Sequence, residues 1–324
     1  MRSEKKFNEL YRSISTEITK EMLKEKAIYD NKRKKFFIDF CIYLYLIVMI
    51  FIFITFHQNF NSLEDMLFPF VIVAITTEIV FLIIANFVYP KISRSVKGQF
   101  KGVILHRIAN AFNFNYSYRS PLKAEDFLES GFDNDFDFFR SEDMLTGTLN
   151  NGSHVILSEI LLTKEVTVID DSGMASKEER TQYDGVYAKI TIPNAYYALM
   201  ELKQNDITQK FAKKRVEMES NEFEKKYDII ANDRIQALKV FNADVIDAIL
   251  KSDQLGVKKL EIKIQYGTMY MRFPRKIFLE MSGENKFMRK DIQKYYDEIG
   301  IILDLIEQVT DSVIRNCELD RKSN

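Results

Sequence analysis

The sequence predicts an α+β protein in which an N-terminal helix and a transmembrane helical hairpin precede a cytoplasmic domain with a mainly antiparallel β-sheet and packed helices. Three observations support this fold class. Two long apolar runs stand close together in the first third of the chain, basic residues flank the pair, and strand-like alternation recurs in the remainder. The averages conceal this segregation, because the 324 residues are 46% hydrophobic and 29% charged, with a formal net charge of −1.

Residues 1–35 are predicted to form a charged cytoplasmic helix. Proline is absent, Glu and Lys are interspersed, and apolar residues recur at helical spacing. These apolar residues are Phe7, Leu10, Ile14, Ile18 and Met22. The pattern fits a solvated helix that leads into the membrane or docks on the C-terminal domain. A short coiled coil that helps the protein to dimerise is the alternative, but the stripe is too short for four heptads.

The two apolar runs are predicted to be transmembrane helices at 36–57 and 67–89, joined by a short external loop at 58–66. Each run is long enough to cross a hydrocarbon core of ~30 Å, which requires about 20 helical residues. A cleavable signal peptide would begin close to the N-terminus, whereas a long charged segment precedes the first run. We therefore predict a membrane hairpin that is not cleaved.

Basic residues on the outer flanks of the hairpin set its predicted orientation. They are Lys32, Arg33, Lys34 and Lys35 before the first run, and Lys91, Arg94, Lys97 and Lys101 after the second. The loop between the runs carries Glu64 and Asp65 but no Lys or Arg. The positive-inside rule therefore places both termini in the cytoplasm. The same basic residues are candidates for contact with anionic lipid headgroups.

One carboxylate, Glu78, interrupts the second apolar run near its middle. A charge at that depth costs ~2.5–3.5 kcal/mol, so Glu78 is expected to be neutral, paired or turned towards protein. In an antiparallel hairpin, Tyr43 and Tyr45 lie at a similar depth, and a tyrosine hydroxyl could bond to the protonated carboxyl group. We favour a polar contact that packs helices or joins two copies. An ion or proton path and an unforeseen ligand are the alternatives.

Residues 98–324 are predicted to form one cytoplasmic α+β domain. Helical periodicity and strand alternation follow one another along it. Helices are expected at 97–114, 242–251 and 291–316, and strands at 153–162, 164–170 and 184–193. The polar stretch 170–182 is expected to be a mobile loop.

Two patterns in this domain are more detailed. A β-hairpin is expected at 258–273, with its turn at Tyr266 and Gly267, because apolar residues alternate on both sides of that pair. The helix at 291–316 carries an apolar stripe, which predicts packing against the sheet. The stripe consists of Ile292, Tyr295, Ile299, Ile302, Ile306, Val309 and Val313.

No combination of residues in the sequence predicts catalysis, a cofactor or a metal. The three histidines are scattered, and glycine-rich phosphate loops and serine nucleophile elbows are missing. Cys41 and Cys317 build neither a disulfide framework nor a zinc site, which fits a reducing compartment. We therefore predict that the protein is not an enzyme. A net charge near zero gives no support for a nucleic-acid partner.

The acidic sequence DNDFD, which contains Asp133, Asp135 and Asp137, is the strongest candidate for a metal loop. An EF-hand loop that begins at Asp133 requires glycine at its sixth position and glutamate at its twelfth. Phe138 and Met144 occupy these positions. The motif therefore predicts a half-buried strand or turn with a solvated acidic face.

Two segments carry a resemblance to a known family. They are SEDMLTGTLNNGSHVILSEILL at 141–162 and, more specifically, FEKKYDI at 223–229 followed by the pattern ND-x-I-x-A. Their order after a membrane hairpin resembles the bacterial domain-of-unknown-function family 3137, over roughly residues 35–310. The sequence departs from the family pattern around 193–212. The resemblance implies a protein of the bacterial cytoplasmic (inner) membrane and implies no activity.

Together these observations predict an integral membrane protein that acts as a membrane-tethered protein-interaction or regulatory module. Its expected partners are the lipid bilayer and either another protein or a second copy of the chain. One alternative is an oligomeric pathway for ions, protons or small solutes that uses Glu78, since two spans form a pathway only as an oligomer. The other alternative is a membrane-associated enzyme of an unfamiliar type.

Overall fold

The computed structural model describes most of the C-terminal two thirds of the chain. The described residues are 6–16, 101–118, 122–132, 135–169, 174–195, 199–205, 214–277 and 289–323, with isolated positions between 31 and 50. The chain divides into two units. One unit combines Met1–Tyr11 with Ile104–Asn324, and the other is Arg12–Val103.

The predicted membrane hairpin falls almost entirely outside the described residues. Isolated helical positions of the run at 36–57 are described, whereas the loop at 58–66 and the run at 67–89 are not. Among the residues that are described, no helix combines the length and the apolar character needed to cross a membrane. The hairpin therefore stays a prediction.

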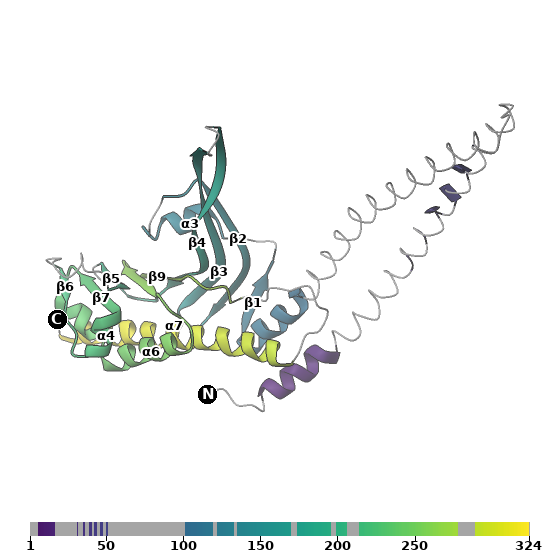
Figure 1. Cartoon of the computed structure of the whole chain (residues 1–324). Helices are drawn as coiled ribbons and strands as arrows, with labels where there is room; N and C mark the ends of the chain where they lie inside the picture. Colours follow the sequence, from purple (N-terminus) through teal and green to yellow (C-terminus); the bar gives the residue numbers. More distant parts are fainter. Residues whose placement is uncertain are drawn as a thin grey trace, which may run out of the picture. The chain divides into compact units, whose positions relative to one another are not determined.

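A single antiparallel sheet forms the framework of the larger unit, which confirms the predicted α+β class (Figure 1). In the described part of the chain its strand order is β1-β2-β3-β4-β9-β8-β5-β7-β6. The strands are β1 (Phe114–Ser117), β2 (Phe138–Thr148), β3 (His154–Ile169), β4 (Ala175–Thr191), β5 (Met200–Gln204), β6 (Arg215–Val216), β7 (Tyr227–Ala231), β8 (Glu261–Gln265) and β9 (Thr268–Phe273).

Helices flank this sheet. Those with labels are α3 (Ala124–Leu128), α4 (Asn221–Lys226), α5 (Arg234–Val240), α6 (Ala243–Gln254) and α7 (Arg289–Ser323), and two more cover 6–16 and 101–111. Figure 1 shows α7 running along the sheet with α6 beside it. The turn between β2 and β3 is fixed to α7, because Asn151 Nδ2 donates a hydrogen bond to Thr310 Oγ1 at 2.8 Å.

The prediction of a loop at 170–182 is wrong from Ala175 onwards, because β4 begins at that residue. Beyond Thr163, β3 pairs only with β4 among the described strands, so the two strands leave the sheet as a ribbon (Figure 1). The β4 residues of the ribbon are exposed. Because solvent reaches both faces there, polar residues do not alternate with apolar ones along this half of β4. Pairing with β3 and a cross-strand ion pair between Lys177 and Glu165 (2.6 Å) hold this half of β4.

The hairpin of β8 and β9 is confirmed, with its turn at Tyr266 and Gly267. Both residues have positive φ values, 48° and 79°, as a two-residue hairpin turn of this hand requires. A Cβ atom at Gly267 would lie 2.6 Å from the carbonyl oxygen of Ala195, so the neighbouring chain also requires glycine there. The apolar residues that alternate on both strands are buried. They are Leu260, Ile262, Ile264, Met269, Met271 and Phe273.

The apolar stripe of α7 is confirmed with one correction, since Tyr296 and not Tyr295 is fully part of the core. The ring of Tyr296 stacks on Phe112 at a centroid distance of 4.9 Å and lies 5.6 Å from the ring of Phe7. The ring of Phe7 comes from the N-terminal helix, and that of Phe112 from the turn between the helix at 101–111 and β1. Their contacts bury Tyr296 in place of Tyr295, which shifts the apolar stripe by one position. The contact of Phe7 also shows that the start of the N-terminal helix packs on α7.

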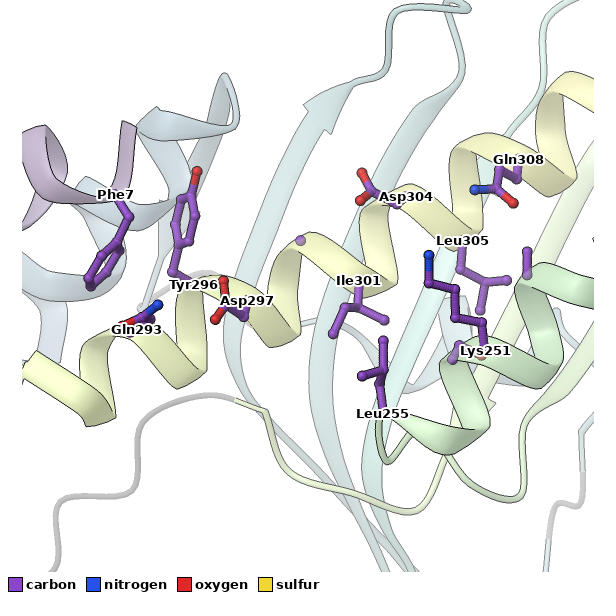
Figure 2. Close-up of a pocket in the computed structure, with 13 residues that line it drawn as sticks. Phe7, Lys251, Leu255, Gln293, Tyr296, Asp297, Ile301, Asp304, Leu305 and Gln308 are labelled. Carbon is purple, nitrogen blue, oxygen red and sulfur yellow. The ribbon is translucent and has the colours of Figure 1, made fainter. Parts of the chain in front are cut away.

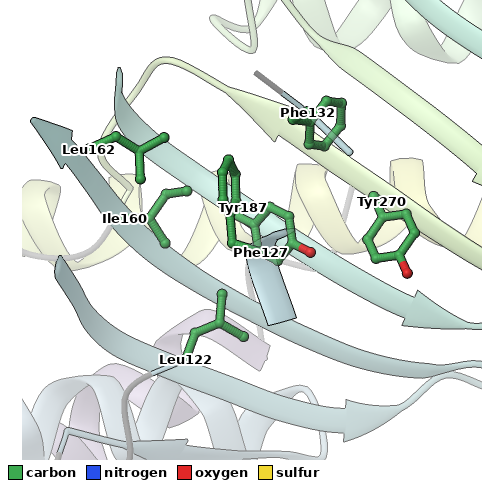
Figure 3. Close-up of a cluster of buried hydrophobic side chains, with 7 residues drawn as sticks. All are labelled: Leu122, Phe127, Phe132, Ile160, Leu162, Tyr187 and Tyr270. Atoms are coloured by element: carbon green, nitrogen blue, oxygen red, sulfur yellow. The ribbon is translucent and has the colours of Figure 1, made fainter. Parts of the chain in front are cut away.

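An aromatic cluster forms the core between α3 and the sheet (Figure 3). Phe127 of α3 stands at its centre, with ring centroids 5.3 Å from Tyr187 and 6.5 Å from Phe132. Tyr187 Oη donates a hydrogen bond to the backbone oxygen of Asp126 at 2.8 Å, which fixes α3 on β4. Burial of the Tyr187 ring raises the pKa of its hydroxyl.

Both the phenylalanine and the aspartates of the acidic sequence before β2 stabilise this fold. Phe136 packs on the ring of Phe127 at 5.8 Å. Asp135 pairs with Lys164, and Asp137 Oδ2 accepts a hydrogen bond from the backbone nitrogen of Glu165 at 2.8 Å. The two carboxylates therefore bind to β3 where the ribbon leaves the sheet. This arrangement agrees with the predicted half-buried segment with an acidic face.

Candidate functional site

The residues of the family-like segment FEKKYDI stabilise the fold. Arg215 Nε lies 2.7 Å from Asp228 Oδ1, and Glu224 pairs with the same guanidinium. Asp228 is fully buried and the Arg215 side chain is 14% exposed, so the pair joins β6 to β7 away from solvent. On the next turn, Lys226 Nζ lies 2.9 Å from Asp253 Oδ2 and ties α4 to α6. These charged residues form ion pairs with one another, so they do not form an open binding site.

Capping side chains fix the two helices that follow this segment. Asp233 Oδ1 accepts hydrogen bonds from the first turn of α5, and Asn242 Oδ1 accepts one from Val245 N at 3.1 Å in α6. Such caps stabilise a helix by ~1 kcal/mol. Asn242 Nδ2 also donates to Ser312 Oγ of α7 at 3.0 Å. The end of α6 near its N-terminus is thus held firmly against α7.

A groove of about 440 Å³ opens between the other end of α6 and the N-terminal half of α7 (Figure 2). On α7 it is lined by Gln293, Tyr296, Asp297, Gly300, Ile301, Asp304, Leu305 and Gln308, which recur at alternating spacings of three and one. These residues therefore form one face of the helix. At a rise of ~1.5 Å per residue, the lined face is about 22 Å long. Phe7 of the N-terminal helix closes one end.

The groove exists because small residues face one another where two helices would otherwise pack. Ala248 and Ser252 line it from α6, and Gly300 lines it from α7. A glycine inside a helix is unfavourable by roughly 0.5–1 kcal/mol relative to alanine. Gly300 therefore lowers the stability of α7 at a position that lines the groove.

The groove combines an apolar floor with a charged rim. Ile301 and Leu305 of α7 form the floor with Leu255, the residue that follows α6 and is 48% exposed. Figure 2 shows the Asp297 and Asp304 carboxylates along α7 and the Lys251 side chain reaching from α6. Partial burial raises the pKa of Asp297.

The two acidic residues of the rim are seven positions apart on α7. The helical rise places them ~10 Å apart along the axis and on the same face. Nothing in the lining belongs to the usual catalytic constellations. The site is suited to binding an elongated apolar surface that carries positive charges at a matching spacing.

None of the site residues predicted from the sequence is among the described residues that line the groove. Tyr43 and Lys35 are helical and exposed in the smaller unit. Glu78 and the remaining predicted residues fall outside the described residues, and their intramembrane and lipid-headgroup roles stay predictions. These residues are Tyr45, Lys32, Arg33, Lys34, Lys91 and Arg94.

Sequence reasoning missed the groove because its polar lining residues resemble those of a solvated helix face. One signal was present. Gly300 interrupts a helix whose neighbours are strongly apolar, and a glycine in that position usually has a packing or functional reason.

Fold and site together define an α+β domain with an antiparallel sheet and an open interhelical groove. Residues 167–310 match the family model described as "Protein of unknown function (DUF3137)". This match, over less than half of the chain, supports the family resemblance predicted from the sequence, and the matched stretch includes the charged FEKKYDI network and all of the groove lining except Phe7.

Comparison with other proteins adds little to this assignment. No curated protein matches the chain. Among solved structures it matches the "crystal structure of the mycobacterial trehalose monomycolate transport factor A, TtfA", with 9% sequence identity and a TM-score of 0.33. The match covers 64% of this chain and 95% of that chain. A similarity this distant carries no argument about function.

Proposed function

We propose that the protein is a membrane-tethered protein-interaction or regulatory module whose α6–α7 groove binds an amphipathic helix of a partner protein. The observation that carries this proposal is the continuous lined face of α7, about 22 Å long at the helical rise, with an apolar floor and an acidic rim. Helix-in-groove recognition uses apolar anchors at spacings of three, four and seven residues. The lining of α7 offers this periodicity to a helix laid along it.

Charge specifies the occupant further. Asp297 and Asp304 line the α7 side of the groove and Lys251 lines the α6 side. A partner helix with two basic residues seven positions apart would face both carboxylates at once, and complementary charge at a rim sets specificity and association rate. The apolar anchors supply the affinity, since complete burial of a leucine-sized side chain contributes ~1.5–3 kcal/mol.

Tethering supplies the link to the membrane. The predicted hairpin would keep the domain at the inner leaflet of the bacterial cytoplasmic membrane. A partner in the same membrane would then meet the groove at an effective concentration in the millimolar range for a short connection. On this proposal the protein works by binding, and no catalytic step is assigned to it.

A photo-crosslinking experiment in cells tests the location of the partner. A photoreactive amino acid is placed at Lys251 on the rim, and the matched control is Asp247, an exposed residue of α6 that does not line the groove. We expect one crosslinked protein from position 251 and a much weaker product from position 247. Equal products from both positions would mean that the groove is not the docking surface.

A charge reversal then tests the binding mode with the purified partner. Asp297→Lys is expected to weaken binding at least about tenfold, because it brings like charges together at the rim. A Lys→Glu change at the facing partner residue should restore the affinity. Asp247→Lys adds the same charge to the same pair of helices and should leave affinity unchanged. Equal affinity of both variants would refute helix-in-groove binding.

A further inference from the structure

A second cavity, of about 250 Å³, lies where β4, β8 and β9 meet the segment that precedes β2. It shares no lining residue with the α6–α7 groove. We propose that this cavity binds a small organic anion that joins a carboxylate or phosphate group to a compact apolar body. The proposal does not depend on the function proposed for the groove.

Arg272 of β9 is the residue that carries the proposal. Its guanidinium carbon lies 4.6 Å from the ring centroid of Phe132 and 5.3 Å from that of Tyr183. Glu261 Oε2 accepts from Nε at 2.9 Å and lies 2.8 Å from Nη2. The side chain is 14% exposed. Two rings and one carboxylate thus hold the guanidinium in a fixed orientation at the wall of the cavity.

Donors of Arg272 remain available to a ligand. A guanidinium carries five N–H donors, and Glu261 engages only Nε and Nη2. Among the described residues, Nη1 has no hydrogen-bond partner. A planar pair of N–H groups matches the geometry of a carboxylate or phosphate. The fixed orientation means that little entropy is lost when such an anion binds.

The charges around the cavity also favour an anion. The two carboxylates that line it are already compensated, Glu261 by Arg272 and Asp135 by Lys164. Lys259 lines the cavity as well and forms no ion pair with any described residue. The cavity therefore offers one fixed guanidinium edge and the ammonium group of one exposed lysine.

The remaining walls limit the size and character of the ligand. Phe136, Leu162 and Pro274 are apolar, and Gln182 and Gln204 add neutral amides. A volume of about 250 Å³ equals roughly eight times the ~30 Å³ that a water molecule occupies in the liquid. The ligand therefore has on the order of eight to ten non-hydrogen atoms by the same comparison.

Two neighbouring features hold the cavity open. Tyr183 Oη donates to the backbone oxygen of Val186 at 2.7 Å, which fixes the ring beneath Arg272. A Cβ atom at Gly185 would lie 2.3 Å from the backbone oxygen of Phe273, so only glycine lets β4 pass this close to the end of β9. The wall on that side is therefore set by backbone and does not depend on flexible side chains.

Ligand-observed NMR on the full chain in detergent micelles tests the proposal, with benzoate and inorganic phosphate as separate probes. We expect at least one probe to bind saturably with a millimolar Kd, and the preference between them identifies the class of acidic group. Lys259→Gln is expected to weaken binding about threefold to tenfold. Lys258→Gln is the matched control, because Lys258 is exposed and adjacent but does not line the cavity.

Arg272→Gln should abolish binding. Because this change also removes packing between two rings, its fold must be checked by circular dichroism, and Lys259→Gln keeps the test decisive if the variant unfolds. Two results would overturn the proposal. One is the absence of saturable binding of either probe to the wild-type chain below about 20 mM, a limit roughly tenfold above the millimolar Kd expected. The other is an equal effect of Lys258→Gln and Lys259→Gln on binding.

Discussion

Replacement of Asp228 by alanine would show how much the charged network behind the FEKKYDI segment stabilises the fold. Asp228 is fully buried and bonds to Arg215 at 2.7 Å, while the Arg215 side chain is 14% exposed. Removal of one partner from a buried ion pair leaves the other charge uncompensated, which costs ~3–5 kcal/mol. Glu224 also pairs with Arg215 and compensates part of that charge, so we expect a loss of about 3 kcal/mol, near the lower end of that range.

The measurement is urea unfolding of the full chain in detergent, followed by pulse proteolysis. A typical domain has a free energy of unfolding of ~5–15 kcal/mol, so the expected loss is large enough to shift the midpoint clearly. The matched control is Glu217→Ala. Glu217 lies 3.6 Å from the same guanidinium but is 78% exposed, and its removal should cost less than about 1 kcal/mol.

A double variant separates the ion pair from simple packing. In Arg215→Met/Asp228→Leu both charges are replaced by apolar groups of similar volume, and such exchanges are often neutral or stabilising. We expect this variant to be at least about 1 kcal/mol more stable than Asp228→Ala. A cost below about 1 kcal/mol for Asp228→Ala, or equal costs for Asp228→Ala and Glu217→Ala, would refute the view that this network stabilises the fold.

Three further predictions concern the aromatic core and the strands. Phe127→Ala should cost ~3–5 kcal/mol in urea unfolding, whereas Leu128→Ala, at a residue that is 43% exposed, should cost about 1 kcal/mol or less. Gly185→Ala should cost ~1–3 kcal/mol in the same assay, because its new Cβ would meet backbone at 2.3 Å; wild-type stability would contradict the close approach. Burial raises the pKa of Tyr187 and of Tyr183, so their protonated forms stabilise the fold fully below the ordinary value of about 10. Stability should fall as the pH rises above 10 towards the folded-state pKa values; midpoints that stay constant from pH 9 to 11.5 would contradict this.

Features that depend on neighbours in the sequence could be predicted, and the hairpin of β8 and β9 is the clearest example. Its alternation and its Tyr266–Gly267 turn lie within one short segment, so local backbone preferences determine both. The long helix α7 was predicted for the same reason. The one-position error at Tyr296 arose because rings from distant segments, Phe7 and Phe112, decide which face of that helix is buried.

Features that depend on contacts between distant segments could not be predicted. The outer half of β4 is polar on both faces, and only its pairing with β3 makes it a strand. The groove requires Ala248 and Ser252 to face Gly300, some fifty residues away in the sequence. Arg272 resembled an ordinary polar strand residue until two rings from separate segments were placed beside it. In each case the sequence contained the residues without indicating their juxtaposition.

The contact between Phe7 and Tyr296 constrains the order in which the protein folds during synthesis. The two residues are 289 positions apart, since 296 minus 7 is 289. Synthesis at ~5–20 residues per second means that Phe7 leaves the ribosome roughly 15–60 s before its partner exists. The N-terminal helix therefore cannot make this contact until Tyr296 has been synthesised. The end of the groove that Phe7 closes is therefore completed only after Tyr296 has been made.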